Sequence, residues 1–133
     1  MKGLLKWFFT FLPIVYMIII WILSSLPVTA VVELPDQAID RYIKESLHLV
    51  EFAILYVLFV FALIAQKKFT YSTNLFFAII AGLYGLVDEI HQSFIPYRSA
   101  TLIDFVKDIT GVAICYYLIT RRCFHNSNKT KFL

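Results

Sequence analysis

The chain concentrates acid–base and anion-binding side chains in the stretch Tyr84–Gly111. In order they are Asp88, Glu89, His91, Gln92, Arg98, Asp104, Lys107 and Asp108. Carboxylates and imidazoles are the usual general acids and bases of enzymes, so Asp88, Glu89 and His91 are candidate catalytic residues. A guanidinium group binds a phosphate or carboxylate through two parallel hydrogen bonds, which makes Arg98 a candidate anion-binding residue. The flanking sequence is almost entirely apolar, and ionisable residues in membrane segments usually mark a functional site.

A second polar group lies at the start of an earlier apolar run. Lys44, His48 and Glu51 are spaced i, i+4 and i+7, which places them on one face of a helix. Carboxylates held at one depth cannot all ionise without strong repulsion, so at least one is expected to be protonated unless a cation neutralises it. The residues expected to bind a ligand are Lys44, His48, Glu51, Asp88, Glu89, His91, Gln92, Arg98, Asp104 and Asp108.

The same side chains offer nitrogen and oxygen ligands of the kinds that divalent metals use. The two matches with local spacing, His48-x-x-Glu51 and Asp88-x-x-His91, are too short to be diagnostic. The sequence therefore permits a divalent metal ion at this site but does not lead us to expect one.

The composition is that of a membrane protein. Of the 133 residues 60% are hydrophobic and 16% are charged, and the mean hydropathy is +0.77; soluble domains average about 25% charged residues. A helix rises about 1.5 Å per residue, so about 20 apolar residues cross the hydrocarbon core. We predict one all-α domain over residues 1–133, an integral membrane four-helix bundle with spans at about 7–26, 46–65, 73–95 and 102–120. Residues 28–44 are predicted to be a polar connector with at most a short helix from Asp36.

The last two spans must include part of the polar stretch. The apolar runs Leu75–Val87 and Ile109–Ile119 are each too short to cross a bilayer. The third helix must therefore continue toward Ile95, and the fourth must begin near Leu102. This places the charged residues at membrane depth instead of in a loop.

The distribution of charge predicts the orientation. Basic residues favour the cytoplasmic side. With the N-terminus inside, the cytoplasmic cations are Lys2, Lys6, Lys67, Lys68, Arg121, Arg122, Lys129 and Lys131, and all nine acids fall in the outer half. Both termini are then cytoplasmic, and the polar ends of spans two, three and four converge in a pocket at the outer leaflet. The basic C-terminal tail is interpreted as an orientation signal, and no nucleic-acid partner is expected.

The polar residues resemble the motifs of the VanZ-like family of bacterial membrane proteins. The matching segments, within about residues 10–120, are Ser24–Pro27, Ile43–His48, Glu51-Phe52, Asp88–Phe94, Pro96, Arg98, Asp104, Asp108 and Gly111. Glu45, Phe52 and Tyr97 differ from the residues that the family often has at these positions. The resemblance implies a multi-pass protein of the bacterial plasma membrane. It also implies a link to the cell envelope, because the founding member is associated with low-level resistance to the glycopeptide antibiotic teicoplanin.

These observations lead to one favoured function and several alternatives. The favoured function is recognition of a membrane lipid, a lipid-linked envelope precursor or a glycopeptide antibiotic by the outward-facing pocket. The first alternative is a membrane-embedded hydrolase or transferase acting on a lipid-borne phosphate or sugar. A second is a structural network in which Asp88, Arg98 and Asp104 pin the helices together. A third, a proton- or cation-linked carrier, is disfavoured because the polar residues stop in the outer half of a monomer, although an oligomer is compatible with the sequence.

Overall fold

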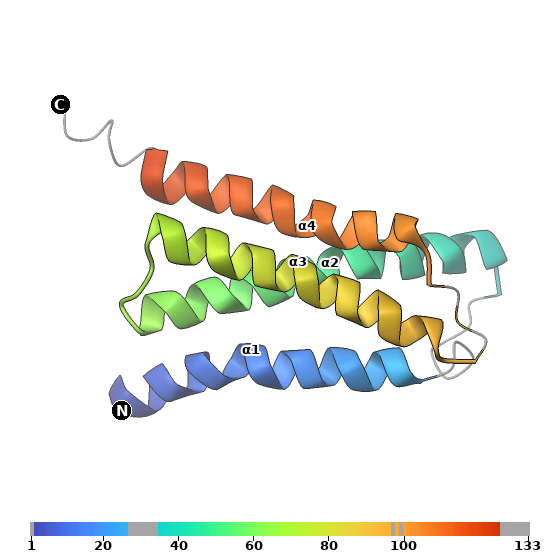
Figure 1. The fold of residues 1–133 in the computed structure, drawn as a ribbon, viewed down its shortest axis with the longest axis horizontal. Coiled ribbons are helices and arrows are strands. Elements are labelled where there is room, and N and C mark those ends of the chain that lie inside the picture. Colours follow the sequence, from blue (N-terminus) through green and yellow to red (C-terminus); the bar gives the residue numbers. More distant parts are fainter. Residues whose placement is uncertain (1, 27–34, 97, 99, 126–133) are drawn as a thin grey trace.

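The chain folds into four α-helices that run back and forth (Figure 1). The structure, a computed structural model, describes residues 2–26, 35–96, 98 and 100–125. The elements are α1 (Lys2–Ser25), α2 (Gln37–Ala65), α3 (Tyr71–Ser93), α4 (Leu102–Thr120) and the π-helical segment η2 (Arg121–His125) that continues α4. The described residues contain no strand, which confirms the predicted all-α class.

Three of the helices are long and apolar enough to cross a membrane. The candidate spans are Gly3–Ser25, Ser46–Ala65 and Tyr71–Ser93, with mean hydropathies of 2.1, 2.5 and 1.4. Helix α4 is more polar because its first two turns carry Asp104 and Asp108 together with Lys107. Its crossing of the bilayer stays a prediction.

The distribution of polarity between surface and interior is the reverse of that in a soluble protein. Large apolar side chains such as Phe8, Phe76 and Ile103 are more than half exposed. The buried polar side chains are Ser24, Asn74, Asp88, Glu89, Gln92 and Asp108. An apolar exterior of this extent would aggregate in water and matches a lipid environment.

Helix α2 is longer than the sequence predicted. It begins at Gln37, so the second half of the expected connector belongs to the same helix as the apolar run. Asp36 is the N-cap, and its side chain accepts hydrogen bonds from the backbone N–H groups of Ala38 and Ile39 at 2.9 and 3.4 Å. No Pro or Gly interrupts the sequence between Gln37 and Ala65, so nothing ends the helix earlier.

Alternating helix direction brings the polar segments to one end of the bundle. Helices α2 and α3 lie between α1 and α4, and the ends of α1 and α3 lie beside the starts of α2 and α4 (Figure 1). We call this the polar end. The bundle thus brings together acids and histidines that are far apart in the sequence, as their helix positions predicted. The membrane face that the polar end occupies stays a prediction.

An apolar layer lies next to the polar end. It is formed by the buried side chains Ile20, Phe52, Leu55, Ala81 and Val112, which come from all four helices. Four of them lie about one turn from a polar-end residue on their own helix, and Ala81 lies about two turns before Asp88. The polar side chains are therefore separated from the other half of the bundle by packed hydrocarbon.

Two glycines let α4 approach its neighbours. A Cβ atom at Gly111 would overlap the carbonyl group of Leu49 in α2, so only glycine permits this crossing. At Gly85 in α3, a Cβ atom would lie 3.1 Å from the Cβ atom of Asp108. These close approaches bury Asp108 between helices α2, α3 and α4.

Candidate functional site

The centre of the polar end is a cluster with one side chain from each of three helices. His48 comes from α2, Glu89 from α3 and Asp108 from α4, and one ligand atom of each lies within 4.8 Å of those of the other two. His48 Nδ1 lies 3.7 Å from Asp108 Oδ1. Asp108 is fully buried, and Glu89 is 6% exposed. We call these three residues the carboxylate cluster.

The atoms of this cluster lack hydrogen-bond partners. Within the described part of the chain, neither His48 Nδ1 nor the carboxylate oxygens of Glu89 and Asp108 make a hydrogen bond of good geometry, although the backbone of Thr101 interacts with Glu89. Leaving a buried polar group unsatisfied costs about 1–3 kcal/mol, and more for a charged group. Such groups are rare in native structures, and each one calls for an explanation such as an ion, a ligand or a catalytic role.

Three further acids lie close enough to act on the cluster electrostatically. The charges of Asp88, Glu51 and Asp104 all act on Asp108, and those of Asp88 and Asp104 also act on Glu89. The cations Arg98 and Lys107 act on His48. The structure therefore brings together most of the residues that the sequence assigned to one site.

Asp88 is held by its neighbours on α3 and α1. Gln92 Nε2 donates to Asp88 Oδ2 at 2.6 Å and also lies 3.3 Å from Ser24 Oγ. All three side chains are buried. Asp88 and Gln92 are four residues apart, and this spacing places them on the same side of the helix. Asp88 Oδ1 remains without a hydrogen bond from any described residue.

Arg98 caps the C-terminal end of α1. Its Nη1 group donates to the carbonyl oxygens of Ser24 at 2.6 Å and Leu23 at 3.3 Å. A guanidinium at this place satisfies the last carbonyls of a helix and complements the negative end of its dipole. Among the described residues, the Nε and Nη2 groups of Arg98 make no hydrogen bond, so they are the donors left for an anion.

His91 lies beside the carboxylate cluster, not within it. Its ring stacks on Trp21 of α1 with centroids 3.8 Å apart, and its Nε2 lies 2.9 Å from Ser25 Oγ. Asp104 sits at the rim, where it accepts a hydrogen bond from Thr101 Oγ1 at 2.6 Å and pairs with Lys107 at 3.4 Å. No ion pair joins Asp88, Arg98 and Asp104 to one another, although the structure describes all three side chains. The Lys44 side chain falls outside the described residues.

Sequence reasoning missed a second buried polar contact in the other half of the bundle. Tyr56 donates its hydroxyl hydrogen to Asn74 Oδ1 at 2.7 Å, and Asn74 Nδ2 donates to Thr120 Oγ1 at 3.0 Å. Tyr56 lies within the apolar part of the second predicted span, which gives no sign of a polar contact. The available signal was Asn74, a single amide in an otherwise apolar part of α3.

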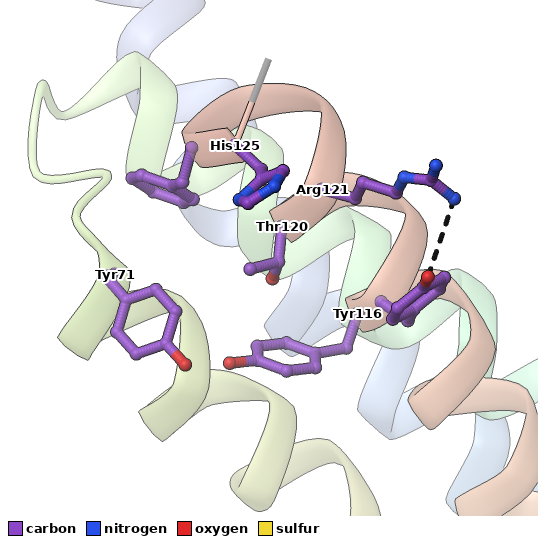
Figure 2. Close-up of a pocket in the computed structure, with 7 residues that line it drawn as sticks. Tyr71, Tyr116, Thr120, Arg121 and His125 are labelled. Atoms are coloured by element: carbon purple, nitrogen blue, oxygen red, sulfur yellow. Dashed lines mark hydrogen bonds between the residues drawn. The ribbon is translucent and has the colours of Figure 1, made fainter. Parts of the chain in front are cut away.

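A cavity also opens at the end of the bundle opposite the polar end. It has a volume of about 640 Å³ and lies between the start of α3 and the end of α4. Figure 2 shows the hydroxyl groups of Tyr71 and Tyr116 facing one another across it, with Arg121 reaching Tyr117 OH at 3.5 Å. Nothing in the sequence indicates this cavity, because its lining residues come from α3 and from α4 with its continuation η2.

Comparison of the chain with models of known protein families finds a match to the family that the polar residues resemble. The VanZ/LLP1 family model matches residues 7–124, and the chain belongs to this family. No curated protein and no solved structure matches the chain. It is thus a membrane protein of the VanZ-like family, and the polar end carries the residues on which the resemblance rests.

Proposed function

We propose that the polar end binds the head group of a lipid or lipid-linked precursor of the bacterial cell envelope, at the outer face of the plasma membrane. The observation that carries this proposal is that buried polar groups of the site lack hydrogen-bond partners. Buried carboxylates of Glu89 and Asp108 and the remaining donors of Arg98 lie together, at one end of a bundle whose exterior is apolar. A head group supplies donors and acceptors to such a site while its acyl or polyprenyl chain stays in lipid.

The proposed orientation is supported by the charges at the opposite end. Lys67 and Lys68 follow α2, and Arg121 and Arg122 follow α4, at the end away from the carboxylate cluster. The positive-inside rule places such residues in the cytoplasm. The polar end then opens outward, where envelope precursors and glycopeptide antibiotics are present.

The test is binding by the purified protein in nanodiscs. We expect a polyprenyl phosphate or a polyprenyl-diphosphate sugar to bind the wild type saturably. Arg98→Ala should weaken the binding of both at least tenfold, and Glu89→Gln should weaken at least tenfold the binding of the sugar-bearing lipid, whose hydroxyl groups donate to that carboxylate. His125→Ala, at the far cavity, is the matched control and keeps wild-type affinity. Unchanged binding and unchanged teicoplanin susceptibility in both polar-end variants would remove the basis of this proposal.

A second candidate is hydrolysis or group transfer on the same class of lipid. The pair His48–Asp108, at 3.7 Å, favours it, because an imidazole beside a buried carboxylate can act as a general base. The distinguishing measurement is turnover of the bound lipid. Chemical change that requires His48 supports catalysis, whereas binding without change supports recognition alone.

A further inference from the structure

The carboxylate cluster has the composition and burial of a metal site. Its three members belong to different helices, and their ligand atoms already lie within 4.8 Å of one another. Zinc bonds to His nitrogen and carboxylate oxygen are about 2.1 Å long, which places tetrahedral ligands about 3.4 Å apart. The separation of 3.7 Å between His48 Nδ1 and Asp108 Oδ1 is close to that value.

The carboxylate oxygens without hydrogen-bond partners indicate that the cluster binds an ion. Glu89 is 6% exposed and Asp108 is fully buried, yet among the described residues neither carboxylate accepts a hydrogen bond of good geometry, and the backbone of Thr101 interacts with Glu89 alone. Two buried carboxylates side by side repel each other when both are ionised. A divalent cation would neutralise both carboxylates, and their unpartnered oxygens would coordinate it.

We propose that His48, Glu89 and Asp108 bind a divalent transition-metal ion, Zn²⁺ or Mn²⁺. The imidazole favours Zn²⁺ and the two carboxylates also suit Mn²⁺, whereas Mg²⁺ and Ca²⁺ prefer oxygen ligands alone. His48, with a side chain 20% exposed, gives the ion a route to the site. The short matches in the sequence did not indicate this set, because its three ligands lie on three helices. The inference goes beyond the proposed function, since the ion needs no lipid to bind.

The experiment measures metal binding by the full chain purified in detergent. The protein is stripped with a chelator and titrated with Zn²⁺ and, separately, with Mn²⁺ by calorimetry. We expect one ion per chain for the wild type with at least one of the two metals. Glu89→Gln, Asp108→Asn and His48→Ala are each expected to weaken binding at least tenfold.

Two matched controls change similar groups outside the cluster. Asp36→Asn replaces the exposed N-cap carboxylate of α2 by another good N-cap residue, and His125→Ala removes an imidazole at the far cavity. Both are expected to keep the affinity within threefold of the wild type. Circular dichroism checks that each variant remains helical.

A second readout keeps the proposal testable if a variant loses its fold. Co²⁺ bound to the wild type is expected to give a visible absorption band that Zn²⁺ displaces. The absence of saturable binding of both metals to the wild type would overturn the proposal. It would also be overturned if the three cluster variants bound as tightly as the wild type. Neither result would affect the test of head-group binding, which is measured without added metal.

Discussion

His48 Nδ1 lies 3.7 Å from Asp108 Oδ1 and links α2 to α4 inside the polar end. This is the only charge-bearing partner that the structure gives to Asp108 among the described residues. Among the described residues Asp108 accepts no hydrogen bond, so His48→Ala would remove its remaining contact with a basic group, and leaving a buried group unpaired costs about 1–3 kcal/mol. We expect His48→Ala to lower the free energy of unfolding by about that amount, measured by denaturant titration in detergent. Leu47→Ala, at an exposed position of the same helix, should change it by much less.

Removing a carboxyl group from the cluster should not destabilise the metal-free protein, in contrast to His48→Ala. Asp108→Asn keeps the shape of the side chain and removes one of two neighbouring buried carboxyl groups, which repel each other when both are ionised. The melting temperature of metal-stripped Asp108→Asn should therefore equal or exceed that of the stripped wild type. Added Zn²⁺ or Mn²⁺ should raise only the melting temperature of the wild type. A large loss of stability in the stripped variant would contradict this prediction.

The close crossing of α2 and α4 predicts that Gly→Ala substitutions at two positions have very different effects on stability. At Gly111 a methyl group would overlap the Leu49 carbonyl, and at Gly82 the nearest atom to a new Cβ lies 3.9 Å away. Gly111→Ala should force the helices apart and destabilise the protein by about 1–3 kcal/mol. Gly82→Ala should be neutral or stabilise it by up to about 1 kcal/mol, because alanine favours the helix. Equal unfolding free energies for the two variants would show that α4 does not pack against Leu49.

The Tyr56–Asn74 hydrogen bond predicts that mutations of these two residues have non-additive effects on the free energy of unfolding. Asn74→Leu leaves the Tyr56 hydroxyl buried without its acceptor, which should cost about 1–3 kcal/mol. Tyr56→Phe in the same background removes that orphaned group and should recover part of the loss. A double-mutant cycle from unfolding free energies measures the coupling. Strictly additive effects would argue against the contact.

The orientation can be tested with single cysteines. Cys123 lies near the end of the bundle away from the carboxylate cluster, is exposed, and can be left as the sole thiol by Cys115→Ser. Ser93→Cys, in a chain lacking both native cysteines, places a thiol at the polar end. In intact cells an impermeant maleimide should label Ser93→Cys and leave Cys123 unmodified until the cells are lysed. The reverse pattern would place the polar end in the cytoplasm.

The meeting of His48, Glu89 and Asp108 was predictable because it depends only on helix positions and alternating direction. Which side chains face one another was harder to predict. Each residue turns the helix by about 100°, so Glu89 and His91 point to nearly opposite sides of α3. That rotation places His91 on Trp21 and leaves Glu89 in the cluster.

Arg98 illustrates what the sequence could not determine. Its positive charge suggested an ion pair or an anion clamp, whereas its Nη1 group binds the last carbonyls of α1. That contact depends on where a distant helix ends. The helical start of α2 at Asp36 was partly predictable from its capping chemistry, but the length of the uninterrupted helix was underestimated.

The layer of Ile20, Phe52, Leu55, Ala81 and Val112 also limits what one copy of the bundle can do. Hydrated ions and polar solutes do not pass through close-packed hydrocarbon without a conformational change. A molecule bound at the polar end of this conformation is therefore separated from the far end of the bundle. Binding and release at the polar end alone, without passage to the far end of the bundle, is what this conformation permits.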